Sequence, residues 1–271
     1  VSNMIIVQLS GGLGNQLFQY ALGRKLSIKN KTDLFLYIGN LKEHSTKRSM
    51  CLDKLNIDCK TTNQTSNARV YKEKFFHYDP LIPLIRNNVF LKGYWQSEKY
   101  FRDIRHILLN EITPKNKLHS SFHEVDEHIL NSESVSIHIR RGDYLSKRNL
   151  EFHGVCSPEY YFKSIKYIMD VTGNKNLSFF VFSDDIKWAR ENIRDSNLSI
   201  NYVSKDNSDF FIDEFFLMSK CKHNIISNST FSWWAAWINQ HPKKIVIAPS
   251  KWFRNNNIVT KDLIPETWVR L

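Results

Sequence analysis

Two adjacent arginines, Arg140 and Arg141, follow directly on a strand-like apolar run. Guanidinium groups at the end of a buried strand are costly to desolvate unless an anion compensates their charge. The planar fork of arginine matches phosphate oxygens, and each charge-assisted hydrogen bond contributes roughly 1.5–3 kcal/mol. The pair therefore indicates a phosphate-binding loop, and an internal arginine–aspartate pair is the alternative. His138, in the strand itself, is compatible with a ligand contact and equally with a satisfied core histidine.

A glycine cluster, Gly11-Gly12-Leu13-Gly14, stands between a strand-like run and an amphipathic pattern. Glycines let the backbone turn tightly and bring its N–H groups, with a helix N-terminus, close to a phosphate. Leu17 stands where a dinucleotide fingerprint needs its third glycine, so a plain tight turn explains the cluster equally well. Asn15 and Gln16 add amide side chains at the mouth of the loop and favour a ligand site that includes Gly14.

Two further polar clusters stand where a strand gives way to a helix. The first contains Ser183, Asp184 and Asp185, and one aspartate of it could accept hydrogen bonds from a nucleobase or a ribose. Capping of the following helix, above all by Ser183, is the alternative. No Asp-x-Asp metal-binding motif occurs in the chain.

The second cluster is rich in hydroxyl groups and forms a potential anion site at a helix N-terminus. Its members are Asn228, Ser229, Thr230, Phe231 and Ser232. The tryptophans that follow cover more than one face of the helix, and a helix that is apolar all round is a buried one. We therefore interpret the tryptophans as core residues.

The elements that position these motifs alternate between strand and helix with short connections. In the first half we predict strands over 4–9, 34–38 and 88–94, and a helix over 15–29. In the second half we predict strands over 134–139, 177–182, 199–203, 223–227 and 244–248, and helices over 158–170, 186–194, 210–220 and 231–239. The alternation predicts mostly parallel sheets that carry ligand loops at the carboxyl ends of their strands.

A polar stretch over 113–133 separates the halves, and residues 40–75 show no regular pattern. We therefore expect two α/β domains, residues 1–120 and 121–271, with a cleft between them. The composition is globular, with 42% apolar residues. No apolar run is long enough to cross a membrane and no signal peptide is evident, so a cytoplasmic protein is expected. Four irregularly spaced cysteines argue against a zinc site or a disulfide scaffold.

The net charge of +11 requires an explanation. A basic helix or an aromatic–basic signature would indicate nucleic-acid binding, and neither is present, so we expect no nucleic-acid partner. An anionic small molecule, an anionic membrane surface that holds a lipid-linked acceptor, and a merely solvated basic surface are the three alternatives.

Taken together, the four motifs resemble the bacterial α-1,2-fucosyltransferases of glycosyltransferase family 11. The resemblance rests on Gly-Gly-Leu-Gly-Asn-Gln-Leu-Phe-Gln-Tyr-Ala at 11–21, His138 to Tyr144, Phe-Ser-Asp-Asp at 182–185 and Ser-Asn-Ser-Thr-Phe-Ser-Trp-Trp at 227–234. These motifs follow the family's order over most of the chain. Residues 40–75 give no comparable match, so acceptor specificity is expected there.

The resemblance implies an α/β fold of the GT-B type, with two Rossmann-like domains that face each other across a cleft. It implies inverting, metal-independent transfer of fucose from GDP-fucose to O-2 of a galactose in a glycan, such as an O-antigen or other surface polysaccharide unit or a host-like oligosaccharide. Arg140 and Arg141 would hold the diphosphate, and residues 228–232 with His138 would line the donor site. Gly14, Asn15 and Gln16 would contact the donor from the other domain, and Asp184 or Asp185 would read the nucleotide.

In the expected mechanism no cofactor takes part, and charge grows on the β-phosphate as GDP departs. Arg140 and the helix N-terminus near Ser229 stabilise that charge. Asp143, in the same loop, is the candidate general base, and its alternative role is to orient an arginine. Three rivals are kept: a similar enzyme with another sugar nucleotide, a binding module without catalysis, and a nucleic-acid binder.

Overall fold

The computed structural model describes residues 4–41, 49–64, 67–205 and 208–271. The chain forms two units: Val1–Lys115 with Ile258–Pro265, and Asn116–Asn257 with Glu266–Leu271. The sequence-based boundary after residue 120 lies a few residues further along the chain. The return of residues 258–265 to the first unit was not predicted.

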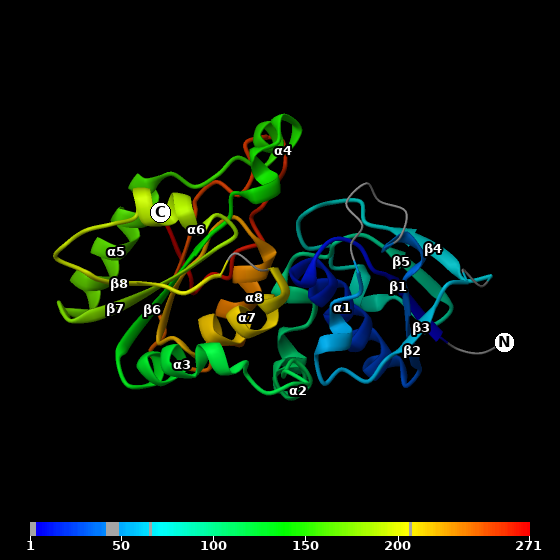
Figure 1. Ribbon diagram of the computed structural model, residues 1–271. Helices are drawn as coiled ribbons and strands as arrows, with labels where there is room; N and C mark the ends of the chain where they lie inside the picture. The colour runs from blue at the N-terminus through cyan, green and yellow to red at the C-terminus, as the bar shows by residue number, and fades with distance from the viewer. Residues whose placement is uncertain (1–3, 42–48, 65–66, 206–207) are drawn as a thin grey trace. The chain divides into compact units, whose positions relative to one another are not determined.

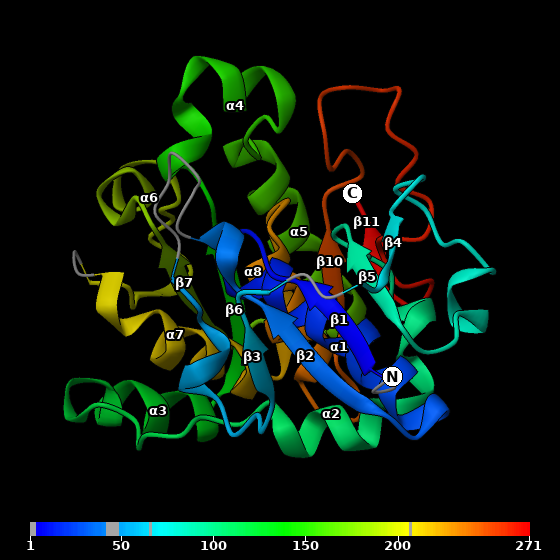
Figure 2. The same cartoon turned by 90° about the vertical axis from the view of Figure 1, so that its right-hand side faces the viewer.

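The first unit is built on a parallel five-stranded sheet with the strand order β3-β2-β1-β5-β4 (Figure 2). The strands are β1 (Met4–Gln8), β2 (Asp33–Tyr37), β3 (Lys60–Thr62), β4 (Arg69–Lys72) and β5 (Val89–Lys92). The central strand β1 pairs in parallel with β2 and β5, and the helix α1 (Leu13–Asn30) packs against β1. The strand predictions over 4–9, 34–38 and 88–94 and the helix over 15–29 are thus confirmed.

The strands β3 and β4 were missed, because they fall in the region 40–75 that shows no regular pattern. Both are edge strands of three or four residues, and most of their side chains are exposed. A short, polar edge strand carries no apolar alternation, so only its pairing with a neighbour reveals it. Part of the same region, residues 42–48 and 65–66, lies outside the described residues.

The second unit holds a parallel six-stranded sheet with the order β11-β10-β9-β6-β7-β8, of which Figure 1 labels β6, β7 and β8. Its strands are β6 (Glu133–Ile139), β7 (Leu177–Ser183), β8 (Ser199–Tyr202), β9 (His223–Ile225), β10 (Val246–Ala248) and β11 (Val269–Arg270). Its helices are α3 (His123–Leu130), α4 (Lys147–Phe152), α5 (Pro158–Thr172), α6 (Ile186–Asn192), α7 (Phe211–Lys220) and α8 (Thr230–Ile238). The five strands and four helices predicted for this half are confirmed, and β11, α3 and α4 were missed.

The helix α3 lies inside the stretch 113–133 that the sequence suggested to be a polar join. Only Ile129 of α3 is buried, and the first turn carries Glu124 and Asp126, so its apolar face is too narrow to stand out from the sequence. In the first unit, the short helix α2 (Arg105–Glu111) was missed for the same reason, because only Leu108 of it is buried.

The two faces of β6 differ in character. Val135, Ile137 and Ile139 pack into the apolar core with α5 and α6. On the other face the hydroxyl of Ser134 accepts a hydrogen bond from the backbone of Lys222, and the hydroxyl of Ser136 accepts one from the Asn224 amide. These polar contacts attach the turn before β9, and β9 itself, to β6, and so place the loop that follows β9 beside the loop that follows β6.

The helix α8 is buried on all sides. Trp233, Trp234 and Trp237 are at most 3% exposed and pack against one another at ring-centroid distances of 5.0–6.2 Å. The interpretation of these tryptophans as core residues is confirmed. Among the described residues, no helix combines the length and the apolar character that crossing a bilayer requires.

Candidate active site

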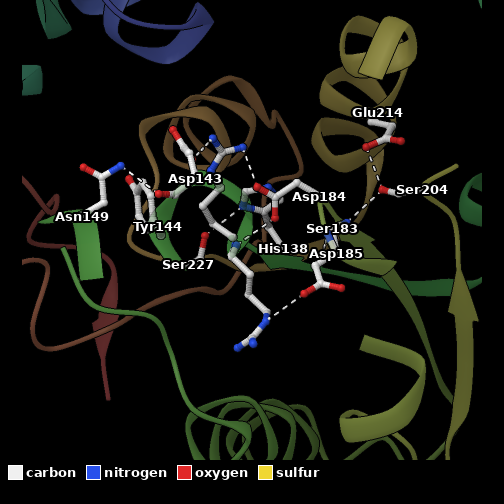
Figure 3. A network of polar contacts seen from close by, with 12 residues as sticks. His138, Asp143, Tyr144, Asn149, Ser183, Asp184, Asp185, Ser204, Glu214 and Ser227 are labelled. Carbon is white, nitrogen blue, oxygen red and sulfur yellow. Dashed lines mark hydrogen bonds and ion pairs between the residues drawn. The ribbon is translucent and has the colours of Figure 1, made fainter. Parts of the chain in front are cut away.

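The loops after β6, β7 and β9 meet at one edge of the second sheet, because these three strands are neighbours in the order β9-β6-β7 (Figure 3). The carboxyl edge of a parallel sheet is where ligands bind in such folds. The second-unit residues predicted from the sequence, from His138 to Ser232, come from these three loops and from the start of α8. The structure therefore brings this group together within one unit.

Arg140 stands at the centre of the cluster and has two carboxylate partners. Its Nη2 lies 2.5 Å from Oδ1 of Asp143, and its Nη1 lies 2.8 Å from Oδ2 of Asp184. Its guanidinium carbon also lies 5.5 Å from the ring centre of Tyr144. Burial lowers the pKa of Arg140, but the two carboxylates outweigh this effect and raise the pKa above its ordinary value. The residue is therefore a permanent cation, and the internal arginine–aspartate pairing left open by the sequence is present.

Asp184 also holds the backbone of the arginine loop. Its Oδ1 accepts a hydrogen bond of 2.8 Å from the backbone N–H of Arg141. A Cβ atom at Gly142 would lie 2.5 Å from Oδ2 of Asp184, so glycine is needed for this close approach. Both carboxylate oxygens of Asp184 are thus engaged within the loop, which favours a positioning role for this residue.

Arg141 points to a different set of partners. Its guanidinium carbon lies 3.9 Å from the ring centre of Trp188, and its Nε lies 3.2 Å from Oδ2 of Asp185. Asp185 also caps α6, because its Oδ1 accepts a hydrogen bond from the backbone of Trp188. The capping alternative is thus realised by Asp185 rather than by Ser183. The sequence analysis did not identify Trp188 as a neighbour of Arg141. Its position three residues after Asp185 places it in the first turn of α6 and could have indicated this.

His138 is buried beneath the site rather than lining it. It is 5% exposed, and its Nδ1 lies 2.9 Å from the Ser227 hydroxyl. Burial, with a smaller contribution from Arg140, lowers the pKa of His138 to about 3, so the imidazole is neutral. Its burial and its contact with Ser227 favour the core interpretation of His138, and its predicted contact with the donor stays a prediction.

Asn228 uses its amide to hold the surrounding loops together. Its Nδ2 donates to the carbonyl oxygens of His153, Gly154 and Trp252 at 3.0, 3.3 and 3.2 Å. The side chain is 2% exposed, and its amide is engaged by these three carbonyl groups. These contacts give Asn228 a structural role, and its predicted contact with the donor stays a prediction.

The start of α8 presents the remaining hydroxyl cluster. Ser229 is the residue before the helix and makes no side-chain cap. The hydroxyl of Ser232 lies 3.3 Å from the Ser229 carbonyl oxygen and is buried, and Phe231 packs its ring against His138. The first N–H groups of a helix have no intrahelical acceptor, so this end is suited to an anion. Thr230 opens the helix at this point.

A hydrogen-bonded chain leads from the site to α7 (Figure 3). The backbone N–H of Ser183 donates to the Ser204 hydroxyl at 2.9 Å, and that hydroxyl donates to Oε2 of Glu214 at 2.7 Å. Burial raises the pKa of Glu214 to about 7. The sequence did not indicate Ser204 or Glu214, because neither stands in a motif.

The glycine loop belongs to the first unit and follows β1. Gly11 has a φ of 74°, and a Cβ atom there would lie 2.4 Å from the Asn15 amide nitrogen, so both observations require glycine. Gly14 is buried in the first turn of α1, and Oδ1 of Asn15 accepts a hydrogen bond of 2.9 Å from the Gln96 amide.

Gln16 is fully buried and committed to its own loop. Its Nε2 donates to the carbonyl oxygens of Gly11 and Ser49, and its Oε1 accepts from the backbone N–H of Cys51. These contacts give Gln16 a structural role in its own loop, and its predicted contact with the donor stays a prediction. Within the residues that the structure describes, no group of three or more His, Cys, Asp or Glu side chains could hold a metal ion.

Comparison with known proteins identifies the family. The model described as "Glycosyl transferase family 11" matches residues 2–271. The chain is similar to the Escherichia coli alpha-1,2-colitosyltransferase, with 33% identity over 99% of this chain and 99% of that protein. It is also similar to galactoside alpha-(1,2)-fucosyltransferase 2 of Oryctolagus cuniculus, with 25% identity over 87% of this chain and 67% of that protein.

Among solved structures, the NodZ alpha-1,6-fucosyltransferase soaked with GDP-fucose matches with a TM-score of 0.57 and 13% identity, over 91% of this chain and 95% of that one. This likeness, together with the two parallel α/β units, confirms the predicted GT-B fold class. The family match spans nearly the whole chain, and the chain belongs to glycosyltransferase family 11.

Proposed function

We propose that this glycosyltransferase moves fucose from GDP-fucose to O-2 of a galactose in a glycan acceptor, with inversion and without a metal ion. The observation that carries the proposal is Arg140, a permanent cation at the carboxyl edge of the sheet beside the N-terminus of α8. The fucosyltransferase among its relatives supports the donor sugar and the linkage.

The arrangement suits a diphosphate leaving group. When the bond between the anomeric carbon and the β-phosphate oxygen breaks, negative charge develops on that phosphate. Arg140 and the first N–H groups of α8 are preorganised cationic and dipolar partners for this charge. Asp143 and Asp184 already pair with Arg140. A bound diphosphate would therefore share the Arg140 guanidinium with these carboxylates or take their place.

The acceptor side of the reaction needs a proton acceptor. The galactose O-2 attacks the anomeric carbon from the face opposite to the diphosphate, its proton passes to a base, and the β-linked donor becomes an α-fucoside. Asp143 is our proposed base, because its carboxylate belongs to the arginine loop and its side chain is 36% exposed.

A second donor is favoured by a specific observation. The similar Escherichia coli protein is named as a colitosyltransferase with the same α-1,2 linkage. We therefore keep GDP-colitose as the alternative donor. The catalytic groups described above act on the diphosphate and on the acceptor hydroxyl, so they are the same for either sugar.

The proposal is tested by incubating the protein with GDP-fucose or GDP-colitose and a panel of galactosides, with product mass and linkage determined by mass spectrometry and NMR. We expect an α-1,2-linked product, and Arg140→Ala serves as the inactive control. Transfer from GDP-colitose alone would replace the donor assignment. Transfer from neither donor, while GDP binds with measurable affinity, would refute the function and leave a nucleotide-binding module.

A further inference from the structure

An apolar turn on the first unit is exposed on its outer face. The turn Ile82–Leu84 is a 3₁₀-helix preceded by Pro80 and Leu81. Ile82 and Ile85 are buried at 1% and 6% exposure, so they anchor the turn in the core. Leu81 and Leu84, three residues apart on the other side of the turn, are 60% and 64% exposed. A surface turn that is apolar on both faces indicates that its outer face is covered by a partner.

The turn lies at the amino edge of the first sheet, beside the end of α1. The ammonium of Lys29 contacts the carbonyl oxygen of Pro83, and the Asn30 amide donates to the carbonyl oxygen of Ile85 at 3.1 Å. Since α1 runs back from the carboxyl edge, its last residues mark the edge opposite to the glycine loop. The surface is therefore separate from the candidate donor contacts of this unit.

Basic side chains stand at the end of α1 and directly after the turn. Lys29, Lys31 and Arg86 are exposed, and none of them forms an ion pair with an acid among the described residues. We name Lys29, Lys31, Leu81, Leu84 and Arg86 the amino-edge patch.

An open hollow of about 530 Å³ adjoins the patch at Lys31. Of the nearby acids, Glu111 pairs with Arg24 and Asp33 pairs with Lys60. Asp79, two residues before Leu81, is buried and accepts a hydrogen bond from the backbone N–H of Leu81. The patch is therefore a cationic surface with two leucines at its centre.

We propose that the amino-edge patch docks this protein on an anionic phospholipid bilayer. Exposed leucines enter the boundary between headgroups and acyl chains, and lysine or arginine side chains near the surface are attracted by anionic lipid. The net charge of +11 adds a long-range attraction of the same sign. Two leucines give a weak and reversible attachment, in which the hydrophobic and the electrostatic contributions are both needed.

The experiment measures partition onto vesicles by flotation, without a sugar-transfer readout, so its outcome is independent of the proposed function. We expect binding to phosphatidylcholine vesicles that contain phosphatidylglycerol, with loss at high salt, and only weak binding to phosphatidylcholine alone. The double change Leu81→Ser with Leu84→Ser should lower the partition coefficient by about tenfold or more. Lys31→Gln with Arg86→Gln should lower it by a similar factor and only on anionic vesicles.

Leu130→Ser with Val171→Ser is the matched control, because both side chains are 58% exposed on the second unit. This control should bind vesicles as the wild type does. All variants should keep the wild-type circular dichroism spectrum and thermal unfolding midpoint. Equal loss in the control, or no binding of the wild type to anionic vesicles, would overturn the proposal. A dimer in sedimentation analysis that Leu81→Ser with Leu84→Ser dissociates would overturn it too, in favour of a second copy as the partner.

Discussion

Arg140 and Arg141 are neighbours in sequence, but the structure gives them different environments. Arg140 faces Asp143, Asp184 and the Tyr144 ring, whereas Arg141 stacks on Trp188 and pairs with Asp185. A guanidinium that stacks on Trp188 and pairs with Asp185 at the start of α6 is less available to a ligand than one at the centre of the site. This difference supports Arg140 as the catalytic arginine and Arg141 as a residue that secures the loop.

Arg140→Lys tests whether the geometry of the guanidinium matters beyond its charge. A lysine ammonium is a point donor and cannot span two phosphate oxygens or serve both carboxylates at once. We expect kcat to fall by about 10²–10³-fold, the scale for the loss of one preorganised donor, and the Kd for GDP to change much less. Turnover within about threefold of wild type would show that Arg140 is not the catalytic arginine.

Asp143→Asn separates the two roles proposed for this aspartate. The asparagine keeps the size of the side chain and an oxygen that can accept from Arg140, but it is not a base. If Asp143 accepts the proton, kcat should fall by about 10²-fold or more while the Kd for GDP stays near the wild-type value. A parallel loss of GDP affinity would instead assign Asp143 to the positioning of Arg140.

Glu214→Gln tests the raised pKa of the buried carboxyl. The folded-state pKa of about 7 lies above the unfolded value of about 4.3, so the folded state binds more protons between these values. Its contribution to stability is therefore fully present below about pH 4.3 and is lost as the pH rises through 7. The free energy of unfolding of the wild type should therefore fall between pH 4.5 and pH 8. We expect this fall to exceed that of Glu214→Gln, which cannot titrate at this position, by about 1–3 kcal/mol.

The measurement is urea unfolding of wild type and Glu214→Gln across this pH range. Glu191→Gln, on the exposed side of α6, is the control and should track the wild type. A difference between wild type and Glu214→Gln that does not vary with pH would contradict the assignment.

At the scale of elements, the turn between β9 and α8 is held by a network that spans much of the second unit. The Asn228 amide reaches the loop after α4 and the segment at Trp252, and the hydroxyl of Tyr144 lies 3.2 Å from the Asn228 carbonyl oxygen. The position of the α8 N-terminus relative to the arginine loop thus depends on contacts between residues far apart in sequence.

Asn228→Ala should destabilise the protein by roughly 1–3 kcal/mol, because it leaves buried carbonyl groups without their donor. The check is the urea midpoint at constant m-value, which separates a change of stability from a change of the unfolded state. Asn149→Ala removes a single, less buried hydrogen bond to the Asp143 carbonyl oxygen and should cost less. Equal losses of stability in Asn228→Ala and Asn149→Ala would show that the hydrogen bonds from Asn228 to the three carbonyl groups stabilise the protein no more than a single exposed one.

At the scale of the whole molecule, the distribution of charge bears on whether the reaction needs a metal ion. The chain carries +11 overall, and the described donor-site residues combine arginines with aspartates in ion pairs. In the proposed mechanism, Arg140 and the α8 N-terminus stabilise the leaving group, so no added cation is required.

Fucosyl transfer should therefore survive exhaustive treatment with EDTA, with kcat within about twofold of the untreated enzyme. The measurement is initial rate at saturating GDP-fucose before and after chelation, followed by addition of Mg²⁺ or Mn²⁺. Loss of activity on chelation with recovery on metal addition would contradict the metal-independent mechanism.

The sequence by itself determined the buried helices and strands and the polar motifs that follow the strands. The strand β7 contains the apolar run Phe179–Phe182, and β6 carries Val135, Ile137 and Ile139 on one face. The parallel arrangement follows from the alternation of such strands with helices. That Arg140 and Asp184 lie at the same edge of the sheet follows as well, since parallel strands release their next loops at one edge. These features depend on local pattern, which a single sequence contains. That β6 and β7 are neighbours is seen only in the structure.

Only the tertiary structure decided which polar residues are structural and which face the site. Gln16 bonds to residues 49 and 51, Asn228 to residues 153, 154 and 252, and Glu214 to Ser204. The short edge strands β3 and β4 likewise exist through pairing with β2 and β5. A hydrogen bond between residues far apart in sequence forms only when the fold brings them together. Residue type and spacing alone do not predict which distant residues become neighbours.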